Sequence, residues 1–140
     1  MRDLRPLLDK LLPDLIDFRR DLHQHPECSY REERTAARVL ERLKEIPDIE
    51  LRTGVAGTGI VATLAGDKAG PTVALRADMD ALPIEEQSSV PHRSQVAGTM
   101  HACGHDGHTT CLLGAAQMLA ACVDELQGPV KFIFQPAEEG

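Results

Sequence analysis

The residues best suited to chemistry stand close together between His101 and His108, in the sequence His-Ala-Cys-Gly-His-Asp-Gly-His. A thiol and several imidazoles within so short a segment are donors that a borderline-soft divalent metal such as zinc selects. Cys103 and His105 are separated by one residue, so an extended segment would place both side chains on one face. A helix beginning near Asp106 would favour the thiolate form of Cys103. We therefore predict Cys103 and His105 as metal ligands; the alternative is a buried cysteine beside a helix-capping histidine.

Two adjacent carboxylates, Glu138 and Glu139, follow an apolar run at the end of the sequence. Neighbours on an extended chain point to opposite sides, so one could bind a metal ion while the other acts as general base on a water molecule. A solvated surface pair is the alternative, and it is the commoner role of adjacent carboxylates. Asp78 and Asp80 are also separated by one residue. For this pair, a functional site and ordinary turn chemistry are equally well supported.

The other histidines and cysteines carry weaker signals. His101 and His108 could orient metal ligands or provide polar cover. No partner can be assigned to the remaining histidines, which are more often capping or surface residues: His23, His25 and His92. No CxxC pair indicates a disulfide framework, and three cysteines are expected in the core: Cys28, Cys111 and Cys122.

The pattern of apolar residues predicts the elements that would position these groups. Helices are predicted over residues 4–22, with a kink or restart at Pro13, over 31–45, and over 107–126, which has little charge and should be mostly buried. Strands are predicted over residues 49–53, 58–65, 72–77 and 130–134, and a long functional loop over 84–100. This mixture indicates an α/β domain of layered sheet and helices. The polar groups then lie where ligands bind in such sheets, beyond the carboxyl ends of strands.

Composition excludes several classes of function. The chain has 140 residues, 42% hydrophobic and 26% charged, which is typical of one globular domain. Its net charge of −7, without a basic stripe, argues against a nucleic-acid partner. No run approaches the roughly 20 apolar residues that span a bilayer, and no secretory apolar region follows the first residue. We therefore expect no membrane partner and a cytoplasmic protein with reduced cysteines.

Four motifs together resemble the N-acyl-amino-acid amidohydrolases, which include hippurate hydrolases and plant auxin-conjugate hydrolases. This group belongs to the aminoacylase and carboxypeptidase clan of dinuclear metallohydrolases. The motifs are Asp-Leu-His-Gln-His-Pro-Glu at 21–27, Leu-Arg-Ala-Asp-Met-Asp-Ala-Leu-Pro at 75–83, Met-His-Ala-Cys-Gly-His-Asp-Gly-His at 100–108 and Phe-Gln-Pro-Ala-Glu-Glu-Gly at 134–140. The resemblance covers essentially the whole chain. It implies a sheet-and-helix catalytic domain of the zinc-peptidase type.

The resemblance also implies roles for individual residues. Cys103, His105 and Glu139 match metal ligands, and Glu138 matches the general base. Asp80 matches an aspartate beside the metals and is the second candidate catalytic residue. The complete enzyme would bind two divalent ions, of zinc, manganese, cobalt or nickel. Its substrates would be small N-acetyl, N-benzoyl or related acyl amino acids, whose amide bond it cleaves.

The same resemblance implies that residues 1–140 are the N-terminal part of the catalytic domain. A lid and dimerisation domain, the C-terminal part and two more histidine ligands would lie outside this sequence. The chain alone is then expected to be inactive, and the complete parent could form homo-oligomers. Asp78 stands where the wider clan has a histidine ligand, so its role stays open. One alternative is a non-catalytic metal-binding or interaction remnant; another, a structural zinc module, lacks the CxxC-type spacing that such sites use.

Overall fold

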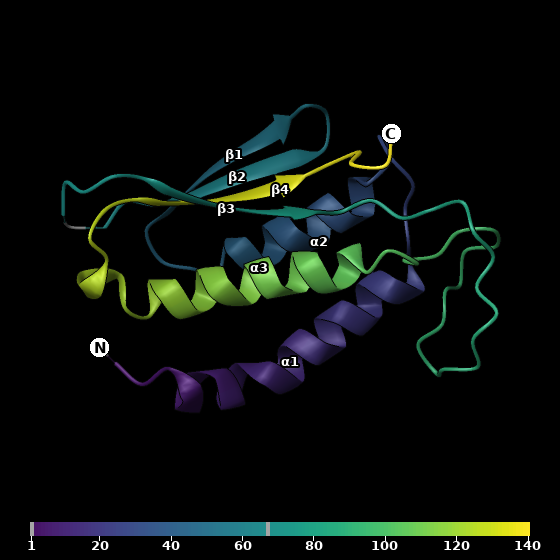
Figure 1. Ribbon diagram of the computed structural model, residues 1–140, viewed down its shortest axis with the longest axis horizontal. Helices are drawn as coiled ribbons and strands as arrows, with labels where there is room; N and C mark the ends of the chain where they lie inside the picture. Colours follow the sequence, from purple (N-terminus) through teal and green to yellow (C-terminus); the bar gives the residue numbers. More distant parts are fainter. Residues whose placement is uncertain (1, 67) are drawn as a thin grey trace.

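Four strands form one mixed sheet in the computed structural model, which describes residues 2–66 and 68–140, and the helices in that part of the chain lie on one side of it (Figure 1). The helices are α1 (Arg5–Gln24), α2 (Glu33–Leu43), α3 (His105–Ala120) and a 3-10 turn (Val123–Glu125). The strands are β1 (Ile49–Val55), β2 (Gly59–Leu64), β3 (Val73–Asp78) and β4 (Val130–Gln135). Helices α2 and α3 lie against the sheet, and α1 packs on α3. The predicted α/β class is confirmed.

The strand order brings the ends of β3 and β4 together. The order is β1-β2-β4-β3, with β1 and β4 antiparallel to β2, and β3 parallel to β4. Parallel strands need a crossover connection, and α3 supplies it. Asp78 at the end of β3 pairs in register with Gln135 at the end of β4. The residues that follow these two strands, and the start of α3, therefore meet at one edge of the sheet.

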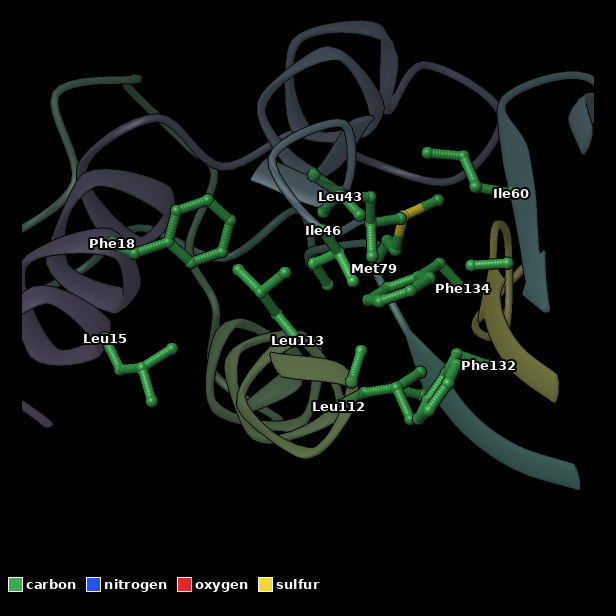
Figure 2. Packing of buried hydrophobic residues seen from close by; sticks show 14 of the residues in the cluster. Leu15, Phe18, Leu43, Ile46, Ile60, Met79, Leu112, Leu113, Phe132 and Phe134 are labelled. Atoms are coloured by element: carbon green, nitrogen blue, oxygen red, sulfur yellow. The ribbon is translucent and has the colours of Figure 1, made fainter. Parts of the chain in front are cut away.

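Alternating side chains of the strands build the core beneath the sheet. On β4, Phe132 and Phe134 are buried, whereas Lys131 between Val130 and Phe132 is exposed, as expected for a strand with one face on the core. Leu113 of α3 and Met79 after β3 are fully buried in the same cluster, which Figure 2 shows between the helices and the sheet. This packing fixes α3 against β3 and β4, and so fixes the start of α3 beside the two strand ends.

The structure corrects several details of the predicted elements. Helix α1 is continuous through Pro13 rather than restarting there, because Leu15 and Phe18 beyond the proline are buried on the core side. Helix α3 starts and ends earlier than 107–126, and the predicted tail forms the separate 3-10 turn. The half of α3 that faces the sheet and α1 is buried, but Cys111 lies on its outer side and is exposed, so its placement in the core was wrong.

Cys122 is buried as expected, although it follows α3 rather than belonging to it, whereas Cys28 is only partly buried and lies outside the core cluster. Residues 84–99, all of them described, form no helix or strand, as the predicted loop requires. Among the residues that the structure describes, no helix combines the length and the apolar character needed to cross a bilayer.

Candidate metal centre

Asp80 links three segments that meet at the edge of the sheet. Its side chain is buried, with Oδ1 lying 3.0 Å from Nδ1 of His105 at the start of α3. Its Oδ2 accepts hydrogen bonds from Ser29 Oγ at 2.7 Å and from the backbone N–H of Glu139 at 2.9 Å. Burial alone would raise the pKa of Asp80, but these hydrogen bonds outweigh it and lower that pKa below its ordinary value. Asp80 is thus an ionised acceptor at neutral pH, not part of a solvated turn.

The contacts of His105 define which of its ring nitrogens is free. Nδ1 also lies 2.9 Å from the backbone carbonyl oxygen of Asp80, and a carbonyl oxygen can only accept a hydrogen bond. Nδ1 therefore carries a hydrogen, which leaves the Nε2 lone pair of the neutral ring available. A carboxylate and a carbonyl behind one imidazole nitrogen are typical partners of a histidine that binds metal through the other.

The predicted ligands lie together. One donor atom each from Cys103, His105 and Glu139 lies within 4.8 Å of the others; His105 is buried, and the other two are exposed. A thiolate, an imidazole and a carboxylate at this separation fit one zinc, manganese, cobalt or nickel ion, and they form a centre open on one side. Their roles as ligands stay predictions, but the structure supplies the proximity that those roles require.

The local reason given for the Cys103–His105 spacing was wrong. Gly104 between them has φ +87°, a left-handed conformation that favours glycine, and His105 is already the first residue of α3. The two side chains approach each other across this tight turn, not along an extended segment. The start of α3 was also expected to favour the thiolate form of Cys103, but neighbouring groups have the larger, opposite effect on its pKa. A hydrogen bond with Glu139, followed by burial and nearby carboxylates, raises the pKa of Cys103. A cation among these groups would reverse that preference, because metal binding displaces the thiol proton.

Asp78 joins the same centre on its other side. Its Oδ1 accepts a hydrogen bond from Nδ1 of His108 at 2.7 Å and lies 3.6 Å from Nε2 of His105. Arg76 donates to Oδ2 of Asp78 at 3.0 Å. Donor atoms of Asp78, His105 and His108 also fall within 4.8 Å of one another. Asp78 and His108 are therefore part of the candidate site. The buried His101 has both ring nitrogens unpaired among the described residues, and neither of its two predicted roles is decided by this placement.

Glu138 lies between Ala137 and Glu139, whose backbone N–H groups donate hydrogen bonds to buried carboxylates. The side chain of Glu138 itself is exposed. Within the described part of the chain, the Glu138 carboxylate makes no hydrogen bond to another residue. An exposed carboxylate without a protein partner, next to a candidate ligand, is free to engage a water molecule. This placement is compatible with the predicted general base, whose role stays a prediction.

His23 was expected at the surface or at a cap, and this expectation was wrong. Its ring is buried: Nδ1 donates to Asp106 Oδ2 at 2.8 Å, and Nε2 lies 3.4 Å from Glu86 Oε1. Arg19 contacts the same Asp106 oxygen at 2.7 Å. This cluster ties α1 and the 84–100 loop to the first turn of α3, next to His105. His92 from the loop stacks edge-on against His23, with ring centroids 5.6 Å apart.

His25 does cap α1, because its Nδ1 donates to the carbonyl oxygen of Asp21 at 2.8 Å. The partners of His23 could not be read from the sequence, since His23 and Asp106 are 83 positions apart. The sequence contained only a weak signal for this cluster. Asp106 directly follows the candidate ligand His105 at the start of a helix, where a buried partner could anchor it.

Comparison with known proteins finds relatives that match nearly the whole chain. The sequence pattern of peptidase family M20/M25/M40 matches residues 74–140. An N-acyl-L-amino acid amidohydrolase of Geobacillus stearothermophilus is 45% identical over 98% of the chain, which covers 37% of that protein. An N-acetyl-L-cysteine deacetylase of Bacillus subtilis is 50% identical over 94% of the chain, which covers 32% of that protein.

A solved structure shows the same fold. A Bacillus subtilis protein described as a dinuclear metal-binding peptidase of family M20 superposes with a TM-score of 0.89 at 48% identity, over 94% of the chain and 36% of that protein. The fold of the described residues is therefore that of part of a metal-binding peptidase. In sequence and in fold the chain therefore resembles peptidase family M20/M25/M40, and it spans about a third of the length of the relatives it matches.

Proposed function

We propose that the protein carrying this chain is a metal-dependent amidohydrolase that cleaves the amide bond of N-acyl amino acids. The observation that carries the proposal is the cluster of Cys103, His105 and Glu139, with Asp80 behind His105. The names of the relatives from Geobacillus stearothermophilus and Bacillus subtilis support an N-acyl amino acid as the substrate class. The acyl group would be acetyl, benzoyl or a related group.

Each residue of the centre then has a role. Cys103, His105 and Glu139 hold a divalent cation, of zinc, manganese, cobalt or nickel, and Asp80 keeps Nδ1 of His105 engaged so that Nε2 is left for the cation. When bound, the cation supplies Lewis acidity, which polarises an amide carbonyl and makes a water molecule easier to deprotonate. Glu138 accepts the proton of the attacking water and passes it to the amine nitrogen as the C–N bond breaks. The products are a carboxylic acid and a free amino acid.

The organisation of the whole protein is part of the proposal. Residues 1–140 form the N-terminal part of the catalytic domain, and further chain supplies the second ion's ligands, a lid and a dimerisation surface. The proposal is supported by the chain spanning about a third of its relatives. A cytoplasmic location would keep the exposed thiol of Cys103 reduced, as a metal ligand must be.

The test uses the longest natural polypeptide that contains this chain. It is stripped of metal with a chelator, reloaded with zinc, manganese, cobalt or nickel, and assayed against a panel of N-acetyl and N-benzoyl amino acids. We expect hydrolysis that disappears with the metal and returns with it. Metal binding without turnover of any acyl amino acid would instead favour the non-catalytic remnant.

A further inference from the structure

Glu32 is a fully buried carboxylate with three hydrogen-bond donors around it. Its Oε1 accepts from the backbone N–H of Ala137 at 2.8 Å and of Tyr30 at 3.1 Å, and its Oε2 accepts from Thr58 Oγ1 at 2.9 Å. Glu32 precedes α2, Thr58 lies in the turn between β1 and β2, and Ala137 follows β4. One side chain thus joins three segments that are far apart in the sequence.

Ala137 has a backbone conformation that an alanine does not adopt without support. Its φ is +52°, in the left-handed region, where a Cβ atom is unfavourable. Such conformations persist when the surrounding structure holds them, and they gather at functional sites. The hydrogen bond from the Ala137 N–H to Glu32 is a direct restraint on this residue. Ala137 immediately precedes Glu138, so its conformation sets the direction in which Glu138 leaves β4.

A second buried carboxylate restrains the other side of Glu138. The backbone N–H of Glu139 donates to Asp80 Oδ2 at 2.9 Å. Glu138 therefore sits between two held peptide groups, one bound by Glu32 and one by Asp80, while its own side chain has no protein partner in the described residues. The carboxylate of Glu138 is therefore oriented through the backbone on either side of it. Asp80 restrains the backbone at Glu139, and Glu32 restrains it at Ala137.

We propose that Glu32 is a positioning residue for Glu138: it holds Ala137 in the left-handed conformation that aims the Glu138 carboxylate at the candidate metal centre. This rests on the proposed function of Glu138 as general base. Catalysis by a general base depends on placement, and a displacement of about 1 Å can lower a rate by on the order of 100-fold. Glu32 acts on the rate through Glu138, whereas Asp80 holds Glu139 in place for the cation.

The test compares Glu32→Ala with Glu27→Ala in the longest natural polypeptide that contains this chain, loaded with metal. Glu27 is the matched control, because its carboxylate also accepts several hydrogen bonds, from Arg34 N–H at 3.0 Å and Thr35 N–H at 2.7 Å, but none from residues 137–139. We expect Glu32→Ala to lower kcat by on the order of tenfold or more, with KM and metal content unchanged. Glu27→Ala should keep kcat, and Glu32→Gln should restore most of it, because its amide oxygen can still accept from Ala137.

A second readout does not depend on activity. Hydrogen exchange at the amides of Ala137 and Glu138 should become faster in Glu32→Ala and stay unchanged in Glu27→Ala. If Glu32→Ala does not fold, Thr58→Val, which removes one partner of Glu32, should show the same changes to a smaller degree. Equal kcat and equal exchange in the Glu32 and Glu27 variants, or no change in Thr58→Val, would overturn the positioning role. Absence of metal-dependent hydrolysis in the unsubstituted protein would overturn the proposed function instead, and the exchange measurement would still decide whether Glu32 restrains Ala137.

Discussion

Nδ1 of His105 lies 2.9 Å from the backbone oxygen of Asp80 and 3.0 Å from its carboxylate, so one aspartate contacts one histidine ring nitrogen twice. The backbone contact sets the tautomer of His105, and the side-chain contact sets the orientation of its ring. Because the same carboxylate also receives the N–H of Glu139, Asp80 controls two of the three candidate ligands at once. Asp80 can therefore orient the candidate ligands His105 and Glu139 without contacting the cation itself.

Replacing Asp80 should weaken metal binding. In Asp80→Ala, His105 loses one partner of Nδ1, and Glu139 loses the acceptor of its backbone N–H. Loss of a hydrogen-bond partner behind a ligand typically lowers metal affinity 10- to 100-fold. A competitive titration with a chromophoric chelator would measure it, with Asp17→Ala, an exposed aspartate on α1, as the control. Equal affinities in the two variants would mean that Asp80 does not organise the centre.

Replacing Glu138 should separate chemistry from metal binding. Glu138→Gln keeps the size of the side chain but cannot accept a proton. We expect kcat to fall by on the order of 100-fold or more, which is the usual scale of general-base catalysis, while metal content stays the same. Steady-state kinetics and elemental analysis on the same sample would show both. Near-normal turnover would assign the base to another residue.

The buried Glu86 should make stability depend on acidity. Burial alone would raise the pKa of Glu86, but hydrogen bonds from Ser88, Ser94 and His23 outweigh it and lower that pKa from 4.5 to about 2. A depressed pKa contributes stability that is fully present above pH 4.5 and is lost as the pH falls towards 2.

The size of this contribution is on the order of 3 kcal/mol for such a shift. Urea unfolding between pH 3 and pH 6 would measure it. The unfolding free energy of Glu86→Gln should be lower than that of the unsubstituted protein at pH 6, and the difference should shrink towards pH 3. A constant difference across this range would contradict the assignment.

Residues 1–140 produced alone should not hydrolyse acyl amino acids detectably. The predicted ligands Cys103, His105 and Glu139 suffice for one ion only, because catalytic zinc typically takes three protein ligands per ion. Strand β3 also lies at an edge of the sheet, and its Val73 is 54% exposed. The check is an assay of the purified 140-residue chain with zinc, manganese or cobalt. Turnover close to that of a complete relative would show that the absent parts are dispensable.

The sequence predicted the fold class and most elements because apolar periodicity is a local signal. It also predicted that the groups around Asp80, His105 and Glu139 would meet, since the carboxyl ends of parallel strands lie side by side. The start of α3 was misplaced because the left-handed Gly104 allows a tight turn where an extended segment was expected. The roles of His23 and Glu32 escaped prediction because their partners, Asp106 and Ala137, are distant in sequence, and no local pattern encodes which buried polar groups pair.

If Cys103, His105 and Glu139 together hold a metal ion, a Cys103→Ala variant should bind less metal than the unsubstituted protein. Cys111→Ala is the matched control, because Cys111 is also an exposed free thiol but lies on the outer side of α3. Both variants would be made in the longest natural polypeptide that contains this chain and measured by elemental analysis. We expect Cys103→Ala to lose metal and Cys111→Ala to keep it. Unchanged metal content in Cys103→Ala would show that Cys103 is not a metal ligand.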